Sequence, residues 1–159
     1  MDQLLNLLRH NARASLEDLA RELALSPTEV AKHIDHLERS GVILGYQAIV
    51  DAEKRAANFV TAVVEVKITP ERGGGFDRLA QRIARFDEVQ SCYLMSGGYD
   101  LLVVVEGATL QQIAGFISQK LATMKGVLST GTHFRLKAYK ENGVPLTRDE
   151  KPQRLAITP

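Results

Sequence analysis

The chain has 159 residues, of which 45% are hydrophobic and 25% are charged, and its formal net charge is +1. This balance is typical of a folded globular protein and excludes a disordered chain. No apolar run approaches the ~18 residues of a membrane-spanning helix. Cys92 is the single cysteine, so no intrachain disulfide can form. The first residues lack the basic and then apolar order of a signal peptide, so we expect a cytoplasmic protein with no membrane partner.

The charges are unevenly distributed along the chain. Residues 1–51 carry five arginines and lysines against eight aspartates and glutamates, a formal charge of −3, and the remainder carries +4. A DNA-binding surface normally presents a basic footprint. The first third of the chain therefore offers little of the positive charge that binding to nucleic acid needs.

Three short helices are predicted within residues 1–45. Ser15 and Ser26 suit the N-cap positions of the second and third helices, and Pro27 and Glu29 complete an S-x-x-E capping box. Gly41 suits the position just after the third helix. The apolar residues at helical spacing, in chain order, are Leu4, Leu5 and Leu8, then Leu16, Leu19, Ala20 and Leu23, then Val30, Ile34 and Leu37.

A tight turn at Ala24-Leu25 separates the second and third helices, as in the helix-turn-helix motif. In that motif the third helix of the domain lies in the major groove of DNA. We therefore predict a trihelical or winged helix-turn-helix DNA-binding domain over residues 1–45, and the alternative is a plain three-helix bundle with a solvated polar face. The predicted contacts to bases and phosphates are Ser26, Thr28, Lys32, His33, His36 and Arg39.

Residues 46–58 are predicted to form a linker strand and a hinge. Val42–Val50 has the composition of a strand that leaves the helices, and residues 51–58 are polar and alanine-rich. From residue 59 the hydrophobic period changes to two, with Val60, Ala62, Val64, Val66 and Ile68 on one face.

A second domain is predicted over residues 59–140. A helix near 76–86 follows the first strand, and two further strands follow at Val89–Met95 and Leu101–Glu106. A T-x-x-Q capping box at Thr109 opens another helix, and a last strand runs from Val127 to about Tyr139. The order βαββαβ predicts an α+β ferredoxin-like fold.

The second domain is expected to associate with a second copy. Two helices can cover only one face of the sheet, and the opposite face is partly apolar at Phe59 and Val63. A homodimer is the economical way to cover that face. Residues 141–159 are polar and contain prolines, so we predict a loosely held C-terminal tail.

The two halves together resemble the Lrp/AsnC family of transcriptional regulators, over roughly residues 2–140. The resemblance in the first half rests on Leu25-Ser26-Pro27, Val30, Ile34, Leu37-Glu38, Gly41-Val42-Ile43 and Gly45-Tyr46. In the second half it rests on Gly98-Tyr99-Asp100 before an apolar strand, and on Gly126-Val127, Thr130 and Thr132. It implies that the second domain is of the RAM type, which binds effectors and assembles subunits.

The resemblance implies a regulator that binds double-stranded DNA as a dimer, assembles further, often to an octamer, and binds an amino acid between dimers. Two features depart from the family. His33 stands where many members have arginine, which leaves the DNA sequence preference open. The usual leader before the first helix is shortened, and we expect this to weaken the packing of that helix.

The predicted effector site is the turn Gly97-Gly98-Tyr99-Asp100, with Thr130 and Thr132 on a neighbouring strand. Glycine amides can reach an α-carboxylate, and Asp100 can accept from an α-ammonium. Tyr99 can wall off an apolar side chain, so the set suits an amino acid. The alternative is a structural turn in which the glycines adopt positive φ and Asp100 bonds to nearby amides.

No metal, cofactor or catalytic residue is predicted. Glu29, His33 and His36 share a helical face, but the H-x-x-H spacing lacks the i, i+4 histidine pair of helical zinc sites. The alternative function is an enzyme on the same scaffold, because the sirohaem decarboxylases resemble this family and use this architecture for tetrapyrrole chemistry. The sequence shows no cluster of arginines and histidines in one predicted pocket, so we predict a regulator and not an enzyme.

Overall fold

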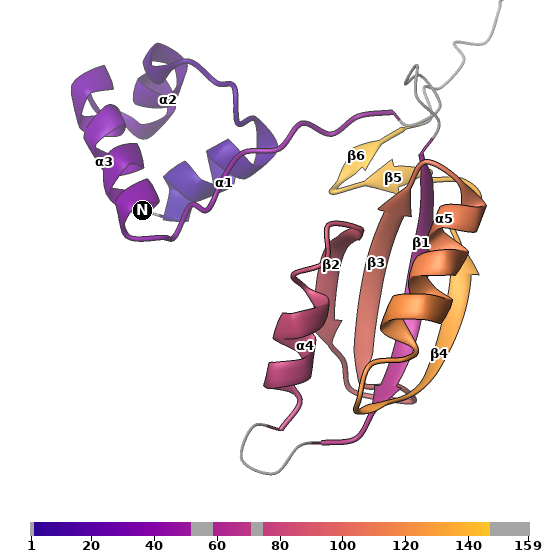
Figure 1. Ribbon diagram of the computed structural model, residues 1–159. Coiled ribbons are helices and arrows are strands. Elements are labelled where there is room, and N and C mark those ends of the chain that lie inside the picture. Colours follow the sequence, from indigo (N-terminus) through magenta and orange to yellow (C-terminus); the bar gives the residue numbers. More distant parts are fainter. Residues whose placement is uncertain (1, 52–58, 71–74, 147–159) are drawn as a thin grey trace, which may run out of the picture. The chain divides into compact units, whose positions relative to one another are not determined.

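The computed structural model describes residues 2–51, 59–70 and 75–146. The chain divides into two compact units, Met1–Ile49 and Val50–Pro159 (Figure 1). The predicted hinge at 52–58, and the predicted tail beyond residue 146, lie outside the described residues. In the described part, no helix is both long and apolar enough to cross a membrane.

The first unit contains the three predicted helices, α1 (Asp2–His10), α2 (Leu16–Leu23) and α3 (Pro27–Arg39). The predicted caps are confirmed: the Ser15 hydroxyl accepts from the Asp18 amide at 3.1 Å, and Ser26 and Glu29 form a reciprocal capping box. Leu16 is 38% exposed because it is the first residue of its helix, so its predicted burial was wrong. The fully buried core consists of Leu4, Leu8, Leu19, Ala20, Val30 and Leu37.

The strand predicted at Val42–Val50 is wrong. Ile43 packs against the three-helix core, but residues 43–51 form neither helix nor strand, and Leu44 is 93% exposed. A strand requires a partner for its backbone hydrogen bonds as well as a suitable composition. The described part of the chain offers this segment no such partner.

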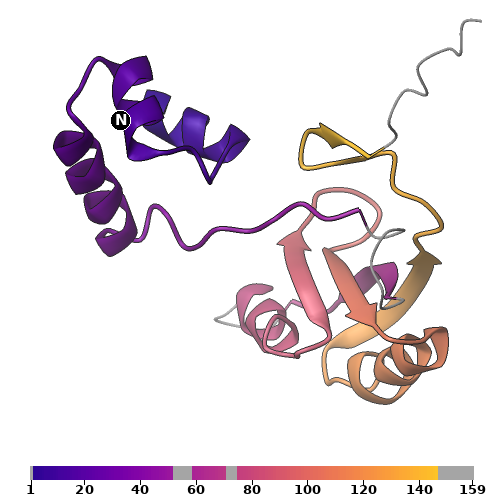
Figure 2. The ribbon, with the colours of Figure 1, turned by 90° about the horizontal axis from the view of Figure 1, so that it is seen from above.

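The second unit has the predicted βαββαβ order. Its main elements are β1 (Val60–Ile68), α4 (Asp77–Ile83), β2 (Val89–Leu94), β3 (Leu101–Gly107), α5 (Leu110–Phe116), the π-helical turn η2 (Ile117–Leu121) and β4 (Val127–Phe134). The four strands form an antiparallel sheet in the order β2-β3-β1-β4. Both helices lie on one face of this sheet (Figures 1 and 2), which confirms the predicted α+β fold.

The core of the second unit lies between that sheet face and the helices. The predicted alternation along β1 is confirmed, since Ala62, Val64 and Val66 are 0% exposed. Residues directly opposite one another in a sheet share a face, so the register extends this buried face across β3. The rest of the buried cluster is Ile68, Leu79, Ile83, Leu101, Val103, Val105, Ile113, Phe116, Ile117 and Leu121.

The predicted loose tail is wrong for its first residues. The last strand of the sheet ends at Phe134, and a hairpin of β5 (Lys140–Glu141) and β6 (Val144–Pro145) follows it. Asn142 and Gly143 connect these strands with φ values of 44° and 88°. Two central residues with positive φ are the requirement of a type I′ turn, for which Asn-Gly is a strong sequence signal. The hairpin could therefore have been predicted from the sequence.

Candidate functional site

Helix α3 presents most of the residues predicted to contact DNA. Thr28, Lys32, His33 and His36 are exposed on it, and none of these four side chains makes a hydrogen bond or ion pair with the described residues. The capping box fixes the start of this helix, so its first turn is rigidly held. The four side chains are thus available to a ligand that approaches α3 from solvent.

Two of the predicted DNA contacts already have partners. The Ser26 hydroxyl donates to Glu29 Oε2 at 2.6 Å and accepts from the Glu29 amide at 3.3 Å. The Ser26 amide also donates to Glu29 Oε2, at 2.9 Å. The two hydrogen bonds that the side chain and the backbone amide of Ser26 donate to this carboxylate lower the pKa of Glu29, so the carboxylate stays charged at the helix start. Arg39 Nε lies 2.9 Å from Asp35 Oδ1, so a phosphate would compete with that carboxylate.

The predicted effector turn is fastened to the end of β1. The Asp100 carboxylate accepts from the Ile68 amide through Oδ2 at 2.8 Å, and the Asp100 amide donates to Val66 O at 3.1 Å. The Asp100 carbonyl in turn accepts from the Met95 amide at 2.8 Å, which closes the turn. Asp100 thus holds β1 where its register with β4 shifts, between Lys67 and Ile68. The sequence predicted hydrogen bonds between Asp100 and nearby amides only as the alternative role of this turn. It did not identify the Ile68 amide as the donor.

The glycines before Asp100 leave open space beside the backbone. Gly97 has a φ of +137°, a conformation that side chains other than glycine rarely adopt. A Cβ atom added at Gly97 or Gly98 would meet nothing within 4 Å. Tyr99 is half-buried beside them. Gly97 therefore has the positive φ expected of a structural turn, whereas Gly98 does not, and both glycines expose their backbone to a ligand.

Thr130 and Thr132 do not lie beside this turn. Thr130 is directly opposite Val66 and Thr132 is opposite Val64, on the β4 side of β1. The turn leads into β3, on the other side of β1. Two strand spacings separate β3 from β4, roughly 10 Å. Within one subunit, the structure brings together the four turn residues and leaves the two threonines apart from them.

The sheet face opposite the helices combines apolar and charged residues. Val63 is half-buried at its centre, directly opposite Val104 on β3 and His133 on β4. His133 Nε2 lies 3.6 Å from Glu65 Oε1. This face is therefore amphipathic, and in a single chain its apolar centre remains partly exposed.

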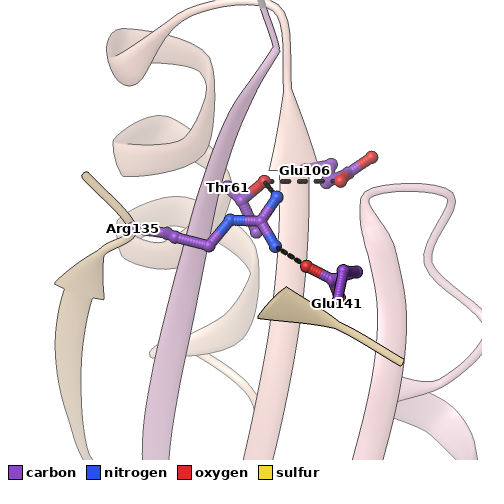
Figure 3. A network of polar contacts seen from close by, with 4 residues as sticks. All are labelled: Thr61, Glu106, Arg135 and Glu141. Atoms are coloured by element: carbon purple, nitrogen blue, oxygen red, sulfur yellow. Dashed lines mark hydrogen bonds and ion pairs between the residues drawn. The ribbon is translucent and has the colours of Figure 1, made fainter. Parts of the chain in front are cut away.

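A polar network at one end of this face holds the β5–β6 hairpin (Figure 3). Arg135 donates to Thr61 Oγ1 at 2.9 Å and to Glu141 Oε2 at 3.1 Å. Thr61 is 5% exposed, and its hydroxyl donates to Glu106 Oε1 at 3.3 Å. The guanidinium therefore joins β1 to the hairpin, and neither this role nor the Glu106 contact was predicted.

The described residues also line a small pocket of about 170 Å³ that is open to solvent on one side. Its lining consists of Asp51, Phe59, Arg135, Leu136, Lys137, Ala138 and Leu146. None of the residues predicted to bind an effector lines it. Among the described residues, no group of three histidine, cysteine or acidic side chains is arranged to hold a metal ion.

Comparison with known protein families supports both units. Residues 61–145 match the family described as the Lrp/AsnC ligand binding domain. Residues 3–43 match the family described as a winged helix-turn-helix DNA-binding domain. The two matches follow the same order as the two units of the structure.

Individual relatives agree with these families. The chain is 44% identical to the uncharacterized HTH-type transcriptional regulator YugG of Bacillus subtilis, over 99% of this chain and 95% of the relative. It is 29% identical to a proline dehydrogenase transcriptional activator of Rhodobacter capsulatus, over 90% of this chain and 92% of the relative. It is also 29% identical to the leucine-responsive regulatory protein of Haemophilus influenzae, over 87% and 83% of the two chains.

Solved structures show the same fold. A transcriptional regulator of Neisseria meningitidis in complex with L-Met superimposes with a TM-score of 0.70 at 25% identity, over 90% of this chain and 92% of the other. Escherichia coli AsnC superimposes with a TM-score of 0.65 at 19% identity, over 87% and 91% of the two chains. The relatives named here are regulators, and the enzyme alternative finds no support among them.

Proposed function

The chain belongs to the Lrp/AsnC family of transcriptional regulators, and from this premise we propose how it reads DNA and responds to a metabolite. It is a DNA-binding regulator with an amino-acid ligand-binding domain. Helix α3 lies in the major groove of double-stranded DNA, and an amino acid bound at the turn before β3 adjusts the affinity. Because the chromosome is its target, the protein acts in the cytoplasm.

The exposed face of α3 carries the proposal for DNA. Lys32 is a point charge for a phosphate, whereas His33 and His36 present ring nitrogens that can bond base edges or phosphates. Ser26 acts indirectly in this proposal, because its hydroxyl completes the capping box that fixes the start of the helix. Arg39 binds a phosphate only by giving up its contact with Asp35.

Charge favours binding by more than one subunit. Residues 1–49 carry five arginines and lysines against seven aspartates and glutamates, so a single first unit attracts DNA weakly. Two linked units bind with a high effective concentration, which raises affinity without any new contact. We therefore propose that a dimer is the smallest assembly with useful affinity for DNA.

The dimer forms through the sheet face that carries Val63 and Val104. Covering this face with a second copy removes apolar area from water, and each buried Å² contributes about 25 cal/mol. The charged residues around the apolar centre then form the rim of the interface. Higher assembly of dimers, up to an octamer, belongs to the same proposal.

The effector site is proposed at Gly97, Gly98, Tyr99 and Asp100. Oδ2 of Asp100 is bonded to the Ile68 amide, and this bond orients the carboxylate. A carboxylate oxygen has further lone pairs, so Oδ1 can accept from the α-ammonium of an amino acid. The L-Met complex of the Neisseria meningitidis regulator supports this ligand class. The two threonines join the site only from another subunit, because β1 separates them from the turn.

The test of this function uses the full chain and the DNA upstream of its own gene. Fluorescence anisotropy of labelled DNA should show salt-sensitive binding, tighter than to scrambled DNA of equal length. A thermal-shift screen of the twenty amino acids should raise the melting temperature with at least one of them. Equal affinity for both DNA sequences, or a melting temperature that no amino acid changes, would contradict the proposal.

A further inference from the structure

The helical layer of the second unit faces away from the sheet surface proposed for the dimer. Helices α4 and α5 lie together on one face of the sheet (Figure 2). The amphipathic face around Val63 lies on the other side of the same sheet. If the second copy covers that amphipathic face, the helical layer forms the outside of the dimer.

Three exposed arginines lie on α4 or directly after it. Arg78 and Arg82 are four residues apart on α4, a spacing that places their side chains on the same side of the helix. Arg85 lies in the turn that follows the helix. Arg82 and Arg85 form no ion pair with any described residue. Their guanidinium groups are therefore directed to solvent with their full charge.

The neighbouring helix adds cations and no carboxylates. Residues 107–125 contain Lys120 and Lys125 but no aspartate or glutamate. Lys120 Nζ is held 2.7 Å from Glu88 Oε1 and lies 5.7 Å from the centre of the Phe116 ring. Lys125 is exposed just before β4. This segment thus adds positive charge to the helical layer.

The acidic residues of the layer do not cancel this charge. Residues 75–88 contain Asp77, Asp87 and Glu88, and one of these, Glu88, is engaged by Lys120. Over residues 75–88 and 107–125 together, five cations stand against three carboxylates. The first unit has the opposite balance, so the positive charge of the chain is carried by the unit that lacks the helix-turn-helix.

We propose that the exposed cations of α4 and of the turn after it, with Arg82 and Arg85 at their centre, contact the phosphate backbone of the same DNA that α3 reads. The inference rests on the proposed function, because it requires both DNA binding and a dimer with outward helices. Arginine suits this role, since its guanidinium bonds phosphate oxygens with two parallel donors. Phosphate contacts carry no sequence information, so the contribution is equal for all DNA sequences. The second unit thereby offsets the weak charge of the first.

The test is the salt dependence of DNA affinity for the double variant Arg82→Gln, Arg85→Gln in the full chain. Each lost phosphate contact lowers the slope of log affinity against log salt by about 0.9, so the slope should fall by about 2 or more. Affinity at low salt should fall about tenfold or more, equally for specific and scrambled DNA. The matched control is Lys137→Gln, Lys140→Gln, which removes the same charge from the segment beyond β4 and should leave the slope near wild type.

The outcomes separate this inference from the proposed function. If Lys32→Ala weakens binding while the arginine variant keeps the wild-type slope, the helical layer does not contact DNA and the inference is overturned. If the lysine control lowers the slope as much as the arginine variant, general charge explains the effect and the inference is likewise overturned. If wild type fails to bind DNA at all, the proposed function itself fails. Light scattering and melting curves establish that each variant is folded and assembled as wild type.

Discussion

The Asp100 carboxylate accepts a hydrogen bond from the Ile68 backbone amide at 2.8 Å, across the end of the sheet. This bond makes Asp100 a structural residue of the turn, and it leaves Oδ1 for a ligand. The two roles are compatible because one oxygen serves each. They can be separated experimentally, because an amide side chain retains an oxygen acceptor but not the charge.

Two substitutions of Asp100 should therefore distinguish its structural role in the turn from its role in binding the effector. Asp100→Asn keeps an oxygen acceptor for the Ile68 amide, so we expect a melting temperature near wild type and a lost response to amino acid. Asp100→Ala leaves that amide without its partner, which should cost about 1–3 kcal/mol of stability as well as the response. Melting curves and DNA anisotropy with and without amino acid measure both effects. An asparagine variant that still responds would remove Asp100 from the effector site.

Helix α3 should respond to substitution according to the chemistry of each side chain. Lys32→Ala removes a phosphate contact, so it should weaken binding to all DNA sequences similarly. His36→Ala should cost about 1–3 kcal/mol and relax the preference at one base pair. Gel shifts with a set of single-base operator variants distinguish these patterns, and Lys140→Ala in the second unit is the control. Wild-type behaviour of both α3 variants would show that another surface reads the DNA.

The dimer interface can be tested at the centre of the amphipathic sheet face. Val63→Glu places a charge opposite Val104, which an apolar interface does not tolerate. We expect light scattering at micromolar concentration to show a monomer. Leu110→Glu introduces the same charge at a leucine that is 50% exposed on α5, on the other side of the sheet, and should leave the dimer intact. A dimeric Val63 variant, or a monomeric wild type, argues against this interface.

The contact between Glu88 and Lys120 predicts a pH-dependent stability. The hydrogen bond from Lys120 holds the pKa of Glu88 below its ordinary value of 4.5. A lowered pKa stabilises the fold above that ordinary value, and the contribution is lost as pH falls through the folded-state pKa. Because the pair is partly exposed, Glu88→Gln should cost only about 0.5–1 kcal/mol at pH 7. Urea unfolding should show this difference closing as the pH falls below the ordinary pKa of 4.5 and through the lowered pKa of the folded state. A difference independent of pH would mean that packing rather than charge is responsible.

The features that the sequence predicted best are those that a few neighbouring residues determine. The Ser26 capping box and the alternation along β1 are both visible in a few consecutive residues, and both are present in the structure. The βαββαβ order follows from the same periodicities. Gly97 was placed correctly in a turn because positive φ has a strong residue preference.

The sequence failed where a residue depends on distant partners. The Val42–Val50 segment has a strand composition, but composition cannot tell whether a partner strand exists. Arg135 meets Thr61 across 74 positions of the chain, and no local pattern encodes this contact. The separation of Thr130 from the effector turn likewise depends on strand order, which places β1 between them. The hairpin at Asn142 is different, since its turn signal was present in the sequence and was overlooked.

The central claim is that one chain couples DNA binding through α3 to an amino acid at the turn before β3. The most direct measurement is the DNA affinity of wild type and of Asp100→Asn, each with and without the amino acid that shifts the melting temperature. Coupling between two sites in a protein is typically about 1–3 kcal/mol, so the affinity of wild type should change roughly 5- to 150-fold. The Asp100→Asn variant should bind DNA equally with and without that amino acid. Equal affinity of wild type in both conditions, or an undiminished change in the variant, would contradict the account.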